Sequence, residues 1–239
     1  MKKLGLGKRV LACAASAATL LTGTTALSGL TTLGSMAASA ASYDNYAKLL
    51  QYSMYFYDGN MCGSDVDTAS QFSWRGSCHG SDEVDGGFHD AGDHVKFGLP
   101  AGYTASTLGW GYYEFKDSYD ALGQTAHLQA LTRPFLRFLK ASTKLSGDTV
   151  TALLQVGVGQ ADHDVWCSPE SQNDQSLRTA YWTSDDASDI AAEYAAALAA
   201  TMHQLRQAED LKYAKALYNY SIKTNKAKLS GGWQLLQLL

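Results

Sequence analysis

The first 40 residues of this 239-residue sequence contain no acidic and no aromatic residue, and no stretch of the chain offers the roughly 18 apolar residues that a membrane-spanning helix needs. The remainder lacks a basic excess, because removing the four cations of the first 40 residues changes the formal net charge from −4 to −8. A nucleic-acid partner requires a basic surface. The composition therefore argues against both nucleic acid and membrane as partners.

The amino-terminal segment has the pattern of a secretory leader. Its four cations precede an apolar, small-residue run over residues 10–21, and Ala38-Ser39-Ala40 has the small-x-small form of a cleavage site. We therefore predict a signal peptide over residues 1–40, a mature start near Ala41, and a soluble, secreted protein. Residues 41–239 are enough for one domain with a buried core.

Cysteine is scarce. With Cys13 in the leader, only Cys62, Cys78 and Cys167 remain, and an odd number cannot pair completely within one chain. One interpretation is a Cys62–Cys78 disulfide, which would stabilise the fold by roughly 3 kcal/mol through loop closure. A metal site is the alternative.

The richest stretch of the sequence is residues 86–98, Gly-Gly-Phe-His-Asp-Ala-Gly-Asp-His-Val-Lys-Phe-Gly. It holds four glycines, two aspartates and two histidines, which predicts a tight loop that aims polar side chains. Asp90 and Asp93 are spaced to face one water molecule, which one carboxylate can orient while the other takes its proton. An exposed acidic turn without a catalytic role is the alternative for this pair alone.

Apolar residues with helical spacing predict five helices. These residues are Tyr46, Leu50 and Tyr57; Leu108, Tyr112, Phe115 and Tyr119; Phe135, Phe138 and Leu139; Ile190, Tyr194, Leu198 and Leu205; and Leu211, Leu217, Tyr218 and Ile222. The first helix is expected from Tyr43 to about Asn60, and the last over residues 209–224.

The segments between these helices are expected to be loops. Residues 60–102 and the polar stretch before residue 186 are rich in Gly, Ser and Asp, and long ordered loops are typical of functional regions. Thr132 and Pro134 are expected to start the third helix, and Ser188 or Asp189 to cap the fourth. Only Leu153 to Val156 has an extended pattern, and with no convincing strand pair we predict an all-α fold.

The last ten residues, 230–239, end in an apolar stretch without a cap or polar tail. That pattern is expected of a truncated or frame-shifted terminus.

Five motifs occur in one order along the chain. They are Ser73-Trp74-Arg75-Gly76, residues 86–100, Gln155-Val156-Gly157, Ala161-Asp162-His163 and residues 188–193, Ser-Asp-Ile-Ala-Ala-Glu. Together they resemble glycoside hydrolase family 9, the secreted cellulases, over residues 43–224. The resemblance implies an (α/α)6 barrel of twelve helices, of which about the first half is present.

The resemblance also implies an endo-β-1,4-glucanase that cleaves cellulose and related β-glucans with inversion. Asp93 would be the general base, and Asp90 would help to hold the nucleophilic water. The family's general acid is a glutamate in the distal half of the domain, which is absent here. Glu114, Glu170 and Glu209 do not match its motif, so we expect the isolated chain to be inactive or poorly folded.

Two other function classes are the alternatives. A non-catalytic carbohydrate-binding fragment would keep the sugar contacts without turnover. A polysaccharide lyase would need cationic subsites for uronic acids, whereas residues 86–98 are acidic.

Sugar contacts are implied at three positions. By resemblance, His163 hydrogen-bonds a glucose next to the scissile bond, and Trp166 stacks on a sugar ring; Tyr181 is a further candidate. The sequence departs from the family at Val158, where an aspartate is usual, and at Val165, where a second tryptophan is frequent.

A zinc site is implied by two cysteines and two histidines. Some family members have two cysteines, a histidine next to the second, and a histidine just before the catalytic loop. Here these are Cys62, Cys78, His79 and His89, a set suited to a closed, structural Cys2His2 zinc site.

A calcium site is implied by a family segment that supplies oxygen ligands, which Ca²⁺ prefers. The matching ligands are Ser184, the carbonyl of Ala187, Asp189 and Glu193. The alternative is that Ser188 and Asp189 merely cap a helix.

Overall fold

The computed structural model describes residues 45–205 and 207–225. The predicted leader over residues 1–40 and the apolar terminus over residues 230–239 lie outside the described residues. The chain divides into the units Met1–Tyr46 and Ala47–Leu239, and all elements below lie in the second unit apart from the first residue of α3. No helix within the described ranges combines the length and apolar character needed to cross a bilayer.

Helices make up most of the described residues. The long ones are α3 (Tyr46–Asn60), α5 (Gly98–Ala121), α6 (Thr125–Ala141), α8 (Ser188–Ala200) and α10 (Ala208–Thr224). Short helices are α4 (Val66–Ala69), α7 (Gly159–His163), α9 (Met202–Leu205), and the 3-10 turns η1 (Pro169–Ser171) and η2 (Gln175–Leu177). All five predicted helices exist, but the fourth stops at Ala200.

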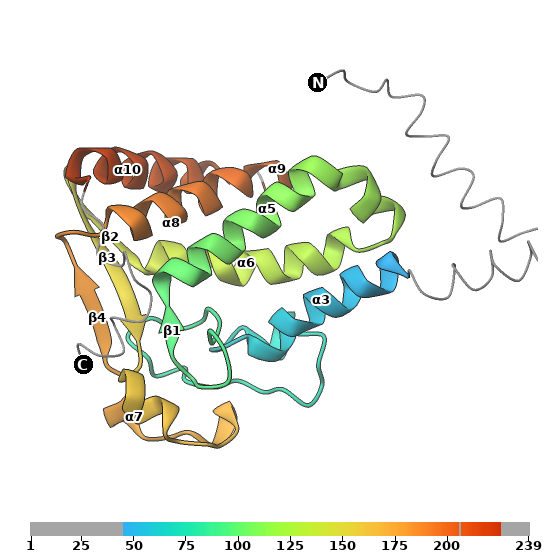
Figure 1. The fold of residues 1–239 in the computed structure, drawn as a ribbon, viewed down its shortest axis with the longest axis horizontal. Helices are drawn as coiled ribbons and strands as arrows, with labels where there is room; N and C mark the ends of the chain where they lie inside the picture. The colour runs from blue at the N-terminus through green and yellow to red at the C-terminus, as the bar shows by residue number, and fades with distance from the viewer. Residues whose placement is uncertain (1–44, 206, 226–239) are drawn as a thin grey trace, which may run out of the picture. The chain divides into compact units, whose positions relative to one another are not determined.

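The helices α5, α6, α8 and α10 lie beside one another (Figure 1), with α5 packed on α6 and α8, and α8 packed on α10. Glycines on α5 make the contact with α8 close. A Cβ atom added to Gly109 would lie 2.9 Å from the Cβ atom of Ala200, and one added to Gly102 would lie 2.8 Å from that of Glu193. Small residues on both helices therefore set this spacing.

Two predicted helix starts were wrong. α6 begins at Thr125, and Pro134 lies inside it. A proline in a helix interior costs about 3 kcal/mol, but the side chains around it are fully or almost fully buried, including Leu131, Phe135 and Leu139, and this packing outweighs the local cost. For α8 the N-cap is Ala187, with no side-chain cap.

The expectation that strands do not pair was also wrong. β1 (Lys96–Phe97), β2 (Thr143–Ser146), β3 (Thr149–Val156) and β4 (Ala180–Thr183) form an antiparallel sheet in the order β1-β3-β2, with β4 also paired to β3. Ser146 pairs with Thr149 across a two-residue turn that includes Gly147, whose φ is 57°. Glycine there and β-branched residues in β3 were the sequence signal for this hairpin.

The sheet positions the long loop that precedes α5. β1 pairs Lys96 with Val156, so residues 86–95 enter the fold next to the end of β3 and the start of α7. Two isolated bridges, Met61 to Phe88 and Gly63 to Cys78, tie the loop to itself. Residues 61–95 are thus ordered by backbone pairing, although most of them form no helix or strand.

Candidate functional site

Asp90 and Asp93 lie on a tight turn that is closed by a hydrogen bond from the Asp90 amide to the Val95 carbonyl at 3.0 Å. Asp90 is exposed and Asp93 is half-buried. Desolvation of its carboxyl group, followed by the neighbouring Asp93 charge, raises the pKa of Asp90. Two acidic side chains thus share one accessible turn, as a water-handling pair requires.

His163 contacts this pair from α7. Its Nδ1 atom lies 3.0 Å from Oδ2 of Asp93, and its side chain is 62% exposed. The hydrogen bond to Asp93, and then the Asp93 charge, raise the pKa of His163. The structure therefore places the predicted sugar-contacting histidine within hydrogen-bonding distance of the predicted base.

Trp166 and Tyr181 differ in exposure. Trp166 is 91% exposed, and such a side chain makes little contribution to the core. Tyr181 lies on β4, opposite Gln155, and packs partly against the core. Trp166 is consequently free to stack on a sugar ring, whereas only part of Tyr181 is accessible.

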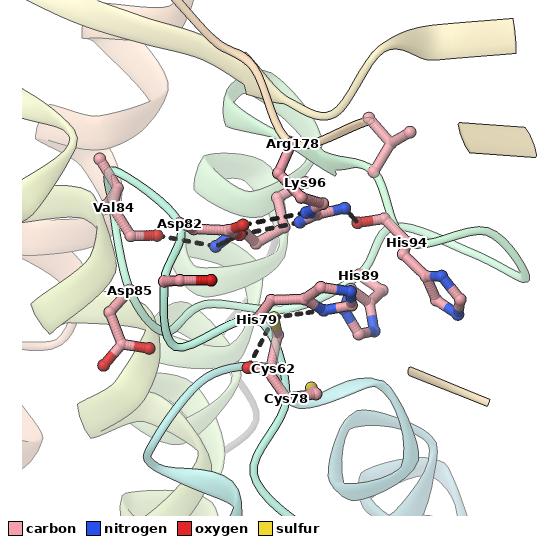
Figure 2. A network of polar contacts seen from close by, with 12 residues as sticks. Cys62, Cys78, His79, Asp82, Val84, Asp85, His89, His94, Lys96 and Arg178 are labelled. Atoms are coloured by element: carbon pink, nitrogen blue, oxygen red, sulfur yellow. Dashed lines mark hydrogen bonds and ion pairs between the residues drawn. The ribbon is translucent and has the colours of Figure 1, made fainter. Parts of the chain in front are cut away.

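A buried charge network supports the turn (Figure 2). Arg178 donates through Nε and Nη2 to the two Asp82 oxygens at 2.9 and 2.8 Å, and Lys96 Nζ lies 2.7 Å from Asp82 Oδ2. Burial alone would raise the pKa of Asp82, but the hydrogen bonds and charges of Arg178 and Lys96 outweigh it and lower this pKa. The two cations are balanced by Asp82 and Asp162, since Arg178 Nη1 also lies 2.9 Å from Asp162 Oδ2.

The four predicted zinc ligands converge beside this network. One donor atom from each of Cys62, Cys78, His79 and His89 lies within 4.8 Å of every other, and all four residues are buried. His89 Nε2 is 3.2 Å from His79 Nδ1, which is 3.7 Å from Cys62 Sγ (Figure 2). Both buried cysteines are free thiols, so the structure does not contain the alternative disulfide.

Three further observations fit a metal at this cluster. A hydrogen bond from Cys62 lowers the pKa of the Cys78 thiol to about 7 despite its burial, which favours the thiolate that metals bind. His79 Nε2 lies 2.8 Å from Gln172 Oε1; if Nε2 carries the proton, Nδ1 faces the other ligands unprotonated. His79 also has a φ of 51°, a strained value for a residue other than glycine.

Arg75 links this cluster to the rest of the loop. Its Nη2 atom donates to the Met61 carbonyl at 3.0 Å and contacts Cys78 Sγ at 3.6 Å, while its Nε donates to Glu170 at 2.7 Å. This gives the Ser73–Gly76 motif a structural role next to the cysteines.

The predicted calcium ligands are engaged elsewhere. The Ala187 carbonyl accepts from the Ala191 amide at 2.9 Å, the Ser184 carbonyl accepts from the Tyr220 hydroxyl at 2.6 Å, and Glu193 accepts from Ser106 at 3.3 Å. Asp189 accepts from the adjacent Ile190 amide. This donor set fits a cation poorly, and calcium stays a prediction.

The surroundings of Glu114, Glu170 and Glu209 do not suit a general acid. Glu170 is buried in part, yet hydrogen bonds from Arg75 and Gly76 lower its pKa, opposite to what a general acid requires. Glu209 is paired with Lys140, which lowers its pKa. Glu114 lies on an exposed part of α5.

The residues that sequence reasoning missed are Asp82, Lys96, Asp162, Gln172 and Arg178. All are buried. A buried charge needs a partner of opposite charge, but Asp82 and its partner Arg178 are 96 residues apart in the sequence. The only sequence signal for any of these residues is that Lys96 and Asp162 lie inside two of the five motifs.

The comparisons with known proteins agree on one family. The model of "Glycosyl hydrolase family 9" matches residues 46–229. Endoglucanase B of Cellulomonas fimi is 37% identical over 185 residues, which are 74% of this chain and 17% of that protein.

Solved structures also match most of this chain. The catalytic domain of Clostridium thermocellum CelT aligns with a TM-score of 0.69 and 39% identity, covering 77% of this chain and 45% of that one. Endoglucanase CelQ of C. thermocellum, crystallised with cellotriose, aligns with a TM-score of 0.71 and 35% identity, covering 79% and 30%. This chain thus spans less than half of each of these proteins, and it belongs to glycosyl hydrolase family 9, with part of that family's (α/α)6 barrel.

Proposed function

We propose that this chain is the amino-terminal part of a secreted endo-β-1,4-glucanase that hydrolyses cellulose or a related β-glucan with inversion. The observation that carries the proposal is the exposed Asp90–Asp93 turn, with His163 3.0 Å from Asp93, in a chain of this family. CelQ, which aligns with this chain, was crystallised with cellotriose. A neutral glucan also suits the acidic, aromatic composition of residues 41–239.

In the proposed mechanism Asp93 removes a proton from the attacking water. Asp90 orients that water, and its pKa is raised first by burial of its carboxyl group and then by the charge of Asp93. The water attacks the anomeric carbon from the face opposite the leaving oxygen, which inverts its configuration. His163 and Trp166 bind the sugar, the first by hydrogen bonding and the second by stacking.

The general acid is proposed to be a glutamate outside these 239 residues. The chain spans 17% of the C. fimi endoglucanase and 45% of the CelT domain, and the three glutamates weighed above have unsuitable surroundings. We therefore expect the isolated chain to show no measurable hydrolysis.

We further propose that Cys62, Cys78, His79 and His89 hold a structural zinc ion. Bound zinc would supply four strong bonds that tie together residues 62–89, which form little regular secondary structure, and it would take no part in the chemistry. Metal analysis of the purified chain tests this. A thiol count after denaturation is the second measurement: zinc leaves Cys62, Cys78 and Cys167 reactive, whereas a disulfide leaves only Cys167.

The test of hydrolysis compares this chain with a version extended by the CelT sequence that it does not cover. Reducing ends released from carboxymethylcellulose should appear only with the extended protein, with the α-anomer as first product. Asp93→Asn should lower this activity by roughly 10²–10⁴-fold. If the isolated chain is active and Asp93→Ala abolishes that activity, the proposal that the general acid lies outside these residues is wrong. A β-anomer as first product would contradict inversion.

A carbohydrate-binding fragment is the second candidate, favoured by the 91% exposure of Trp166. Binding of cellotetraose to the isolated chain, without turnover, would support it.

A further inference from the structure

The carboxylate of Asp162 lies at the centre of the buried contacts beneath the Asp90–Asp93 turn. Its side chain is fully buried. Oδ1 accepts a hydrogen bond from the His94 amide at 2.8 Å, and Oδ2 accepts from Arg178 Nη1 at 2.9 Å and from Gln172 Nε2 at 3.4 Å. The Asp162 side chain thus connects α7 with residues 86–98 and with the loop that carries Gln172.

The residues that precede or follow these contacts in the chain are Asp93, which is half-buried, and His163, which is exposed. His94 follows Asp93 in the chain, and His163 follows Asp162. The Asp93 and His163 side chains meet at 3.0 Å. The contacts therefore form a closed ring: the Asp162 carboxylate holds the peptide next to Asp93, and the Asp162 backbone carries the partner of Asp93.

Arg178 adds further hydrogen bonds to this ring. Its Nη1 atom donates both to the His94 carbonyl at 2.8 Å and to Asp162. Its remaining nitrogens bind Asp82, and Figure 2 shows Arg178 between Asp82 and His94. Both the N–H and the C=O of the His94 peptide are thus bound by buried, charged groups. Charged hydrogen bonds are stronger than neutral ones. Within the turn itself Asp93 is held by neutral donors only: the Val95 amide donates to Asp93 Oδ1 at 3.4 Å, and the Asp90 amide closes the turn on the Val95 carbonyl.

We propose that Asp162 is the positioning residue that holds Asp93 and His163 together in the geometry needed for base catalysis. The proposal rests on the glucan hydrolysis proposed above, but the arrangement itself can be tested without it. A base must lie within hydrogen-bond reach of the water it activates, and a misplacement of about 1 Å costs roughly 10²-fold in rate.

The first test is a pH titration of His163 by NMR, which is feasible because the chain has only 6 histidines. The charges acting on His163 are Asp93, Asp164 and Asp162, of which Asp93 is the strongest. If Asp162 holds the pair, Asp162→Asn should move the His163 pKa toward the ordinary value of about 6.5, and Asp93→Asn should do the same.

Asp164→Asn is the matched control. It also removes a neighbouring carboxylate that raises the His163 pKa, but Asp164 accepts only from the exposed Gln160 in the contacts described. The shift in Asp162→Asn should clearly exceed that in Asp164→Asn. Equal shifts in the two variants would mean that Asp162 acts as a charge alone, and would overturn the proposal.

A second measurement covers the case in which Asp162→Asn does not fold. In the wild-type chain, the His94 amide should exchange with solvent far more slowly than the exposed Ala91 and Gly92 amides, because it donates to Asp162 inside the protein. Similar exchange rates at all three amides would overturn the proposal without any variant.

The extended protein separates this proposal from the proposed function. If it hydrolyses glucan, Asp162→Asn should lower kcat by roughly 10²-fold with little change in KM, and Asp164→Asn should not. If the extended protein is inactive while the His163 titration still depends on Asp162, the proposed function fails and the positioning of the pair stands.

Discussion

The segment over residues 82–96 has a buried part and an exposed part with opposite properties. Asp82, His89 and Lys96 are buried, and each has polar partners inside the protein. Asp90, Ala91 and Gly92 are exposed. The difference indicates that one loop combines two parts: its buried charges fix the backbone, and its exposed turn carries the carboxylates that are proposed to bind and activate water.

The largest effect is expected from the buried charges. Asp82→Ala leaves Lys96 and Arg178 without their shared carboxylate, and breaking a buried ion pair costs about 3–5 kcal/mol of unfolding free energy. Chemical denaturation measures this. Glu83→Ala is the adjacent control: its partner Lys144 is 57% exposed, so a change of no more than about 1 kcal/mol is expected. Equal losses in both variants would contradict the contrast.

Two glycines of the same loop provide the next test. Gly87 has a φ of 84°, and a Cβ atom there would lie 2.7 Å from the Phe138 ring, whereas a Cβ atom on Gly92 would meet nothing within 4 Å. Gly87→Ala should cost about 1–3 kcal/mol from backbone strain and more from the overlap. Gly92→Ala should stay within about 0.5 kcal/mol. Thermal denaturation of both variants measures whether the buried part of the loop tolerates an added methyl group less well than the exposed part.

The proposed zinc site allows the buried part of the loop to be tested through a residue that is not itself a proposed ligand. Gln172→Ala removes the group bound to His79 Nε2 at 2.8 Å, and loss of such a partner weakens metal binding by roughly 10–100-fold. Competition with a chromophoric chelator measures the affinity. Gln172→Glu keeps an acceptor and should bind zinc more tightly than Gln172→Ala; the reverse order would contradict the role of Gln172.

The smallest effect on stability is expected at Trp166. Because its side chain is 91% exposed, Trp166→Ala should change the unfolding free energy by less than about 0.5 kcal/mol. Binding of cellotetraose by this chain should weaken by about 2- to 10-fold, the range of an aromatic stacking contact. Calorimetric titration and denaturation of the same variant test both halves, and a large stability loss with unchanged binding would make Trp166 a structural residue.

The candidate functional side chains were easier to predict from the sequence than the sheet and the buried ion pairs that hold them in place. Asp90, Asp93 and the four candidate zinc ligands were predicted from residue type and local spacing, and the structure brings the four ligands together. The sheet was missed because β2 and β3 lie between helices and carry few signals beyond Gly147 and the β-branched residues of β3. The Asp82–Arg178 pair was not predictable, since neither residue shows in the sequence which opposite charge 96 residues away it will meet.

Residues 86–98 illustrate which features depend on the sequence alone and which depend on the tertiary structure. The sequence by itself determined the chemical groups, the glycines that allow the turn, and the helical stripes that build the core around it, because these depend on residue type and short spacing. Only the tertiary structure decided that His163 lies on Asp93, that Asp162 and Arg178 bind the His94 peptide, and that His79 meets His89. Those contacts depend on distance and burial, which set the strength of each charge interaction and are created only when distant segments pack together.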